Sequence, residues 1–287
     1  MGNKHIYTSN TVSRLLSVPY SEEPNLAESL SGANNGIFIG NSIKMNMPIF
    51  LDFNFLFNPH VFIVGMTGSG KTYLMKSILL RLGFMIDASV IILDFTGEYL
   101  ETANVMGMES NAKQRTPDDI NINKSTYFML KGLKEDEKAQ RASEILKAIA
   151  TRMRGNLDRQ NKRTFVLLDE SWKLINSNED LEIIVREGRK YGVGLLLASQ
   201  LLEDMSDGIV ANSASVFIFR MQVRKSAEKV MANYNLNQEY IETIQGLDQG
   251  RCLLIKLDKA NKRSITVIRR VLGIAVSPKT TILFPGK

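Results

Sequence analysis

The sequence is poor in the residues that build disulfides and metal centres. It contains one cysteine, Cys252, and two histidines, His5 and His60. A single cysteine excludes an internal disulfide bond, and one cysteine with two histidines is a poor basis for a zinc site. This composition fits a reducing compartment, so we expect the protein in the cytoplasm.

Long apolar runs are also absent. The most apolar stretches, residues 61–66 and 193–198, are far shorter than the roughly 18 apolar residues that a membrane span needs. The N-terminal residues lack the apolar core of a signal peptide. We therefore expect a soluble protein, which could still dock on the cytoplasmic face of a membrane complex.

Positive charge is in modest excess and is unevenly distributed. The chain has 36 basic and 30 acidic residues, a net charge of +6. Two zones carry much of this excess: Arg141, Lys147, Arg152, Arg154, Arg159, Lys162 and Arg163 in the first, and Lys256, Lys259, Lys262, Arg263, Arg269 and Arg270 in the second. Such zones can neutralise phosphates and suit a nucleic-acid partner. The alternative is a solvated basic surface without a ligand.

Apolar periodicity predicts an α/β fold. Continuous apolar runs, typical of buried parallel strands, alternate with amphipathic helical segments. We expect strands at residues 61–64, 90–93, 127–130, 164–168, 194–198 and 215–219, and helices at residues 71–82, 135–153, 181–190, 227–234 and 238–244. A hairpin is expected within residues 36–57, and a closing antiparallel pair at 251–257 and 264–271. The pattern predicts a mostly parallel sheet with helices on both faces.

A complete phosphate-binding motif follows the first buried strand. Residues 65–72 read G-M-T-G-S-G-K-T and match G-x-x-x-x-G-K-[ST] in full. Backbone N–H groups of such a loop cradle phosphates, and the helix N-terminus adds partial positive charge. We expect Lys71 to reach the β- and γ-phosphates and the Thr72 hydroxyl to bind Mg²⁺. The nucleotide-binding set is Gly65, Thr67, Gly68, Ser69, Gly70, Lys71, Thr72 and Tyr73.

Acidic and amide residues end two later strands. The strand T-F-V-L-L ends in Asp169 and Glu170. We expect Asp169 to hold Mg²⁺ and Glu170 to polarise the attacking water as general base. Gln200 ends the strand at 194–198 and is expected beside the phosphate loop, near the γ-phosphate. The alternative is a pair of solvated acids and a residue that only caps a turn.

One motif suggests a different class of nucleotide hydrolase. Residues 94–97 read D-F-T-G, the D-x-x-G magnesium motif of small GTPases. Those enzymes read guanine with N-K-x-D, and N-K-S-T at 123–126 and N-K-R-T at 161–164 both lack the final Asp. The acids at 169 and 170 would also go unused. We therefore expect ATP, with Mg²⁺, rather than GTP.

The motifs together resemble the HerA/FtsK superfamily of P-loop ATPases, above all HerA and the conjugation (type IV secretion, CedB-like) DNA-transfer ATPases. The resemblance covers residues 36–270 and is most specific in R-E-G-R-K-Y-G-V at 186–193, which leads to A-S-Q at 198–200. Residues 94–99, D-F-T-G-E-Y, are similar to HerA's D-x-H-G-E-Y, with Thr96 in place of the usual His. Residues 212–220 and 246–251 resemble a later strand and an L-x-x-G-R turn of that superfamily.

The resemblance implies a RecA-like (ASCE-type) core that works as a homohexameric ring and threads double-stranded DNA with ATP. It implies that Arg189 is an arginine finger acting in trans on the neighbouring subunit's ATP, with Arg220 as second candidate. The alternative for Arg189 is the polar face of a helix. We expect an arm at 1–35, a motor domain at 36–272 with a small helical insertion at about 104–160, and a tail at 273–287. The N-terminal domains of HerA and the conjugation ATPases are not recognisable here, so the chain could be the core of a longer protein.

Three functions therefore compete. The first is a motor that moves DNA in transfer, import or processing, with a membrane channel or a nuclease as a possible partner. The second is a secretion or pilus-assembly ATPase that acts on protein. The third is a nucleotide-gated scaffold, which would have no need of the general base Glu170.

Overall fold

The computed structural model describes residues 36–43, 48–52, 60–83, 88–108, 120–155, 163–169, 178–200, 207–257 and 263–271. The expected arm at 1–35 and tail at 273–287 lie outside these residues, as does Glu170. Among the described residues, no helix is both long and apolar enough to cross a membrane.

The described residues form one ten-stranded sheet in the order β2-β1-β10-β9-β8-β3-β7-β6-β4-β5. Its strands are β1 (Gly36–Ser42), β2 (Pro48–Asp52), β3 (His60–Val64), β4 (Ala88–Asp94), β5 (Thr126–Met129), β6 (Arg163–Leu168), β7 (Val193–Ser199), β8 (Ser213–Ile218), β9 (Cys252–Leu257) and β10 (Arg263–Val271). From β8 to β5 all neighbouring strands are parallel, and the pairs from β2 to β8 are antiparallel. The predicted fold class, a mostly parallel sheet with antiparallel closing strands, is confirmed.

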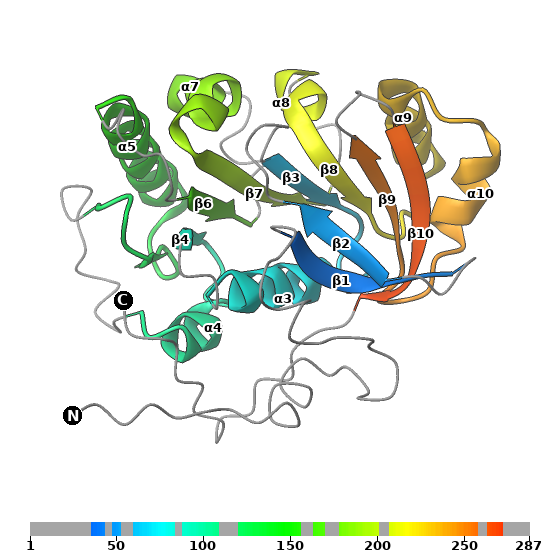
Figure 1. The fold of residues 1–287 in the computed structure, drawn as a ribbon, viewed down its shortest axis with the longest axis horizontal. Helices are drawn as coiled ribbons and strands as arrows, with labels where there is room; N and C mark the ends of the chain where they lie inside the picture. Colours follow the sequence, from blue (N-terminus) through cyan, green and yellow to red (C-terminus); the bar gives the residue numbers. More distant parts are fainter. Residues whose placement is uncertain are drawn as a thin grey trace.

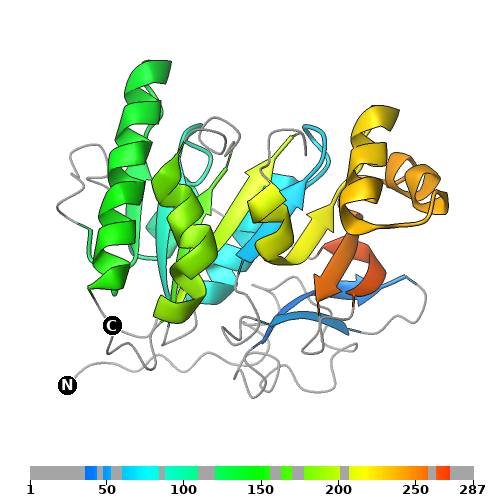
Figure 2. The same ribbon diagram turned by 90° about the horizontal axis from the view of Figure 1, so that it is seen from above.

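Helices cover both faces of the parallel part (Figure 1). They are α3 (Lys71–Gly83), α4 (Leu100–Val105), α5 (Glu135–Arg154), α7 (Glu179–Glu187), α8 (Asp207–Asn212), α9 (Arg224–Tyr234) and α10 (Glu239–Gln245), with a short 3₁₀ turn, η3 (Gly188–Tyr191), after α7. Helices α3 and α4 lie on one face, and α5, α7, α8 and α9 on the other; Figure 2 shows the second group in front of the sheet. The short helices α4 and α8 were not predicted from the sequence.

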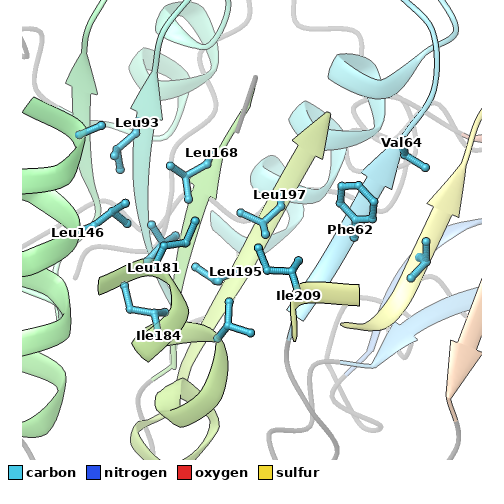
Figure 3. Packing of buried hydrophobic residues seen from close by; sticks show 14 of the residues in the cluster. Phe62, Val64, Leu93, Leu146, Leu168, Leu181, Ile184, Leu195, Leu197 and Ile209 are labelled. Carbon is cyan, nitrogen blue, oxygen red and sulfur yellow. The ribbon is translucent and has the colours of Figure 1, made fainter. Parts of the chain in front are cut away.

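The strand pattern explains why both faces are covered. Along β3, Phe62 and Val64 belong to the core under α5, α7 and α9, whereas Val61 and Ile63 belong to the core under α3. A strand that is apolar on both faces must be buried on both, which is the behaviour of parallel sheets with crossover helices. Figure 3 shows the first core, where side chains of β3, β7 and β6 meet those of the covering helices.

The segment that we expected as a helical insertion contributes to this same architecture. Strand β5 pairs with β4 in parallel and forms an edge of the sheet. Helix α5 buries Ile145, Leu146 and Ile149 in the first core. At the start of α5, Glu137 accepts a hydrogen bond from the backbone N–H of Lys134, which satisfies one of the polar groups at the helix end. Residues 109–119, between α4 and β5, lie outside the description.

Candidate active site

The phosphate loop joins the carboxyl end of β3 to the start of α3. Gly65 has a φ of 151°, and a Cβ atom there would lie 2.6 Å from Cβ of Phe219. Only glycine tolerates both the conformation and the contact. Gly70, at the other end of the loop, has a φ of 120°. The spacing of glycines in the motif is therefore set by the backbone of the turn and by its close approach to Phe219, the residue that follows β8.

The lysine of the motif lies across the loop. The ammonium nitrogen of Lys71 donates to the carbonyl oxygens of Gly65 at 2.6 Å and Met66 at 3.1 Å, and Lys71 is buried. A buried ammonium group requires acceptors, and here they include two carbonyls of the loop itself. This places its positive charge at the loop that would enclose the phosphates.

The other residues of the predicted nucleotide set differ in exposure. Ser69 is buried, and its hydroxyl donates to the carbonyl of Met66 at 2.7 Å. Thr67 is exposed, Thr72 lies half-buried in the first turn of α3, and Tyr73 is 48% exposed. The loop tip and the outer side of α3 are thus open to solvent, whereas the base of the loop is packed.

Three neighbouring segments hold the loop through backbone hydrogen bonds. The N–H of Gly65 donates to Ser199 of β7 at 3.4 Å, and the N–H of Met66 donates to the carbonyl of Arg220 at 2.9 Å. The N–H of Gly250 donates to the carbonyl of Ser69 at 2.9 Å. Gly250 belongs to the L-D-Q-G-R turn before β9, so the resemblance noted there marks a segment that rests on the phosphate loop.

The sheet brings the predicted acid and amide to the same edge as the loop. Val64 is paired with Ser199, and Leu168 with Leu197. Asp169 follows β6, is 6% exposed, and accepts a hydrogen bond from the Tyr99 hydroxyl at 2.6 Å. Gln200 follows β7 and is exposed. Carboxyl ends of adjacent parallel strands converge at one edge, which is the usual place for a ligand in such sheets.

The D-x-x-G motif has a structural role. The carboxylate of Asp94, which is fully buried, accepts hydrogen bonds from the backbone N–H groups of Thr96, Gly97 and Tyr99 and from the hydroxyls of Thr96 and Tyr127. These donors use the acceptor positions of its two oxygens. Asp94 is therefore the centre of a turn, and the small-GTPase interpretation loses the carboxylate that it would assign to Mg²⁺.

Arg189 and the phosphate loop lie at opposite ends of the parallel strands: Arg189 lies at the amino ends, and the loop lies at the carboxyl ends. It is exposed in η3, which ends just before β7 begins, whereas Gln200 follows the end of β7. The seven residues of β7 separate the two ends by about 20 Å, at about 3.3 Å per residue. The structure does not bring Arg189 together with Lys71 and Asp169 of the same chain.

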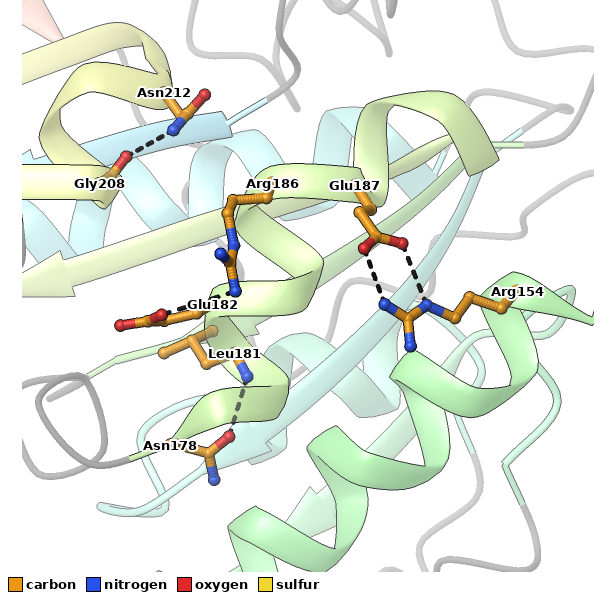
Figure 4. A network of polar contacts seen from close by, with 8 residues as sticks. All are labelled: Arg154, Asn178, Leu181, Glu182, Arg186, Glu187, Gly208 and Asn212. Atoms are coloured by element: carbon orange, nitrogen blue, oxygen red, sulfur yellow. Dashed lines mark hydrogen bonds and ion pairs between the residues drawn. The ribbon is translucent and has the colours of Figure 1, made fainter.

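The turn that carries Arg189 is firmly anchored. Arg154 of α5 makes two hydrogen bonds to the Glu187 carboxylate, of 3.0 and 2.7 Å (Figure 4). A Cβ on Gly188 would lie 2.6 Å from the carbonyl oxygen of Val193, so only glycine allows this approach. His60 joins α7 to the sheet: its Nε2 lies 3.0 Å from the carbonyl of Val185, and the N–H of Leu195 donates to its Nδ1.

Burial determines the charge of His60. The imidazole is 2% exposed, and loss of hydration lowers its pKa from 6.5 to about 4, although the bond to the Val185 carbonyl acts in the opposite direction. A neutral ring that accepts at Nδ1 must carry its proton on Nε2, which then donates to Val185. His60 therefore acts as a neutral link between α7, β3 and β7.

The backbone of Arg220, the second finger candidate, lies beside the phosphate loop of its own chain. Its carbonyl accepts a hydrogen bond from the N–H of Met66, and its Nε is buried without a hydrogen-bond partner among the described residues. Sequence reasoning did not identify Tyr99 or Gly250 as parts of the site. Each residue contacts a partner that is distant in the sequence: Asp169 lies 70 residues from Tyr99, and Ser69 lies far along the chain from Gly250. The D-F-T-G-E-Y and L-D-Q-G-R strings were therefore the signals that the sequence offered for them.

A RecA-like sheet with this phosphate loop and a buried acid at the end of a nearby strand defines the class as P-loop ATPase. The chain belongs to the family described as helicase HerA, central domain, whose profile matches residues 37–270. The chain is 27% identical over 149 residues to the DNA double-strand break repair helicase HerA of Sulfurisphaera tokodaii, which covers 48% of this chain and 30% of that protein. It thus spans about a third of that relative's length.

Solved structures with the same fold include VirB4 of Thermoanaerobacter pseudethanolicus, with a TM-score of 0.65 and 14% identity over 85% of this chain and 98% of that one. The genome packaging NTPase B204 of Sulfolobus turreted icosahedral virus 2, in complex with AMPPCP, has a TM-score of 0.56 and 19% identity over 74% of this chain and 98% of that one. The type VII secretion ATPase EccC of Thermomonospora curvata has a TM-score of 0.58 and 17% identity over 88% and 28%. The predicted fold, superfamily and ATPase class are confirmed.

Proposed function

We propose that this ATPase is the motor of a homohexameric ring that translocates double-stranded DNA, in DNA transfer, import or processing. One observation carries the proposal: Arg189 and the phosphate loop lie at opposite edges of one sheet in a HerA-family domain. Arg189 is exposed beyond the amino end of β7, and its own site lies at the carboxyl end of that strand, which is about 20 Å long. It is therefore positioned to serve the site of another subunit.

The residues of the site fit ATP with Mg²⁺. The positive φ values of Gly65 and Gly70 shape a loop of backbone N–H groups, and the Lys71 ammonium lies against that loop. In the proposed complex Lys71 binds the β- and γ-phosphates, and Thr72 and Asp169 hold Mg²⁺, which when bound neutralises phosphate charge and orients the γ-phosphate. Asp169 is buried and accepts a hydrogen bond from the Tyr99 hydroxyl. Such a bond orients a carboxylate that serves as a metal ligand.

The remaining residues are proposed to act on the water and on the phosphate. Glu170, which follows Asp169, accepts a proton from the attacking water. Gln200, at the end of the strand bonded to Gly65, orients that water or the γ-phosphate. Arg189 of the neighbouring subunit compensates the negative charge that develops in the transition state. Each site is then complete only at a boundary between two subunits.

DNA as the substrate rests on the family and on charge. The matched relatives include a protein named as a DNA repair helicase and one named as a genome packaging NTPase. The first basic zone includes exposed Lys147 of α5, although Arg141 and Arg154 in that zone are paired with Glu144 and Glu187. In the second zone, Lys256 donates to the carbonyl of Phe50 and so also stabilises the fold. The contact with DNA is proposed to be to phosphates and independent of sequence.

A motor that acts on protein is the second candidate. It is favoured by the similarity to the secretion ATPase EccC, although that similarity is one of fold alone. The two candidates differ in what stimulates hydrolysis. A DNA motor couples its ATPase cycle to duplex DNA, whereas a secretion or pilus motor ignores it.

The test is the ATPase rate of the full chain with and without duplex DNA, at low and physiological salt. We expect stimulation by duplex DNA of unrelated sequences. A rate that is independent of DNA under conditions where the ring is assembled would reject the DNA motor and favour the protein motor. Lys71→Ala, measured in parallel, controls for contaminating ATPase activity.

A further inference from the structure

A chain of buried hydrogen bonds leads from the D-F-T-G-E-Y turn to Asp169. The Tyr127 hydroxyl and the backbone N–H of Tyr99 both donate to Oδ2 of Asp94, at 2.8 and 2.9 Å. The hydroxyl of Tyr99 then donates to Oδ2 of Asp169 at 2.6 Å. Tyr99 and Asp94 are fully buried, and Asp169 is 6% exposed. Buried charge-assisted bonds of this length are strong and directional.

The position of the Tyr99 hydroxyl is fixed from several sides. Its backbone N–H is bound by Asp94, and its carbonyl accepts the N–H of Ala103 at 2.8 Å in the first turn of α4. Its ring packs in the core under α3, with the Lys76 ammonium 5.8 Å from the ring centre. A side chain held at its backbone, along its ring and at its hydroxyl has little freedom to rotate.

The direction of the bond to Asp169 is also fixed. The phenol of Tyr99 carries an O–H group that can donate, whereas the oxygens of the Asp169 carboxylate can only accept. Tyr99 is therefore the donor and Asp169 is the acceptor. One oxygen of Asp169 is thereby assigned to a protein hydrogen bond.

We propose that Tyr99 is a positioning residue, which holds the Asp169 carboxylate in the orientation that binds the Mg²⁺ of the nucleotide. This inference rests on the proposed role of Asp169. A carboxylate rotates about its Cβ–Cγ bond, and a donor fixed in the core restricts that rotation before the metal arrives. Hydrogen-bond partners of metal ligands typically change metal affinity or activity by about 10- to 100-fold when removed. A tyrosine that only needed an acceptor for its hydroxyl would leave metal affinity unchanged.

The chain provides a matched pair of variants for the test. Tyr99→Phe and Tyr127→Phe each remove one hydroxyl from a buried ring in the same network, but only the first hydroxyl contacts Asp169. The measurement is Mn²⁺ affinity of the full chain with a non-hydrolysable ATP analogue, by electron paramagnetic resonance. We expect Tyr99→Phe to weaken Mn²⁺ binding by about 10- to 100-fold and Tyr127→Phe to leave it unchanged. Affinity for the analogue without metal should be unchanged in both. If Tyr99→Phe lowers the unfolding temperature, all proteins are compared at a temperature at which each of them is folded.

Asp169→Asn separates this inference from the function on which it rests. If Asp169→Asn loses Mn²⁺ affinity but Tyr99→Phe does not, the positioning role is overturned and the metal ligand stands. Equal loss in Tyr99→Phe and Tyr127→Phe also overturns it, because the effect then passes through the fold. If Asp169→Asn binds Mn²⁺ normally, the assignment of Asp169 fails first, and the role of Tyr99 fails with it.

Discussion

The Lys71 ammonium donates to the carbonyl oxygen of Gly65 at 2.6 Å, so the lysine of the phosphate motif is bonded to the first glycine of the same motif. A second bond to Met66, at 3.1 Å, holds the same ammonium against the loop. The lysine thus has acceptors inside the protein, and the phosphates of a nucleotide would compete for its three N–H donors.

Lys71→Ala should abolish nucleotide binding, because the charge beside the loop is lost together with two bonds that brace it. Isothermal titration with ATP is the direct measurement. Lys225→Ala is the control, since it removes an exposed lysine of α9 that has no role in the proposed site. Affinity near that of wild type in Lys71→Ala would reject the phosphate-loop assignment.

Glu170→Gln should bind ATP normally and turn over more slowly by roughly 10²- to 10⁴-fold, if its carboxylate is the general base. The amide keeps the size of the side chain but cannot accept the proton. Steady-state ATPase rates and analogue affinity are measured on the same preparation. A variant that hydrolyses ATP within a few-fold of the wild-type rate removes Glu170 from this role.

Arg189→Ala should bind ATP but lose turnover by roughly 10³-fold or more, as for other arginine fingers. Co-expressed with Lys71→Ala, it should regain part of the activity, because some boundaries then pair an intact Lys71 with an intact Arg189. Lys190→Ala is the matched control, as an exposed cation in the same turn. Mixed rings without any recovery would exclude action in trans and direct attention to Arg220.

His60 should make the protein less stable in mild acid. Above pH 6.5 the ring is neutral in the folded and unfolded chains; below it the unfolded chain takes up a proton that the folded chain, with a His60 pKa of about 4, does not. Stability is thus lost as pH falls from 6.5 to 4, by up to about 3 kcal/mol. Denaturant unfolding at both ends of this range should show a smaller loss in His60→Gln. An equal loss in both proteins would contradict a neutral buried imidazole.

DNA binding should weaken steeply with salt and depend little on sequence, since the proposed contacts are to phosphates. Fluorescence anisotropy with two unrelated duplexes across a salt series measures both. Lys147→Ala should lower the salt slope by about one unit if that side chain contacts a phosphate. Lys225→Ala, at an exposed lysine of α9 that lies outside both basic zones, serves as the control. Affinity that stays constant with salt would contradict a motor that follows the backbone.

Most of the fold could be predicted from local pattern. The buried strands and the helices α3, α5, α9 and α10 were expected close to their observed bounds, because a continuous apolar run or a 3.6-residue period reports burial directly. The short helices α4 and α8 were missed, since six residues are too few to show a period. The polar segment after β4 concealed α4, whose place depends on the turn around Asp94.

The sequence by itself determined the chemistry of the loop and the class of the protein. Gly65 to Thr72 are contiguous, so their spacing already implies the turn that their backbone adopts. Only the tertiary structure decided that Asp94 caps a turn, that Tyr99 reaches Asp169, and that Arg189 lies at the far edge of the sheet from its own phosphate loop. The physical reason is that strand order and direction bring distant residues together or keep them apart, and neither is written in local periodicity.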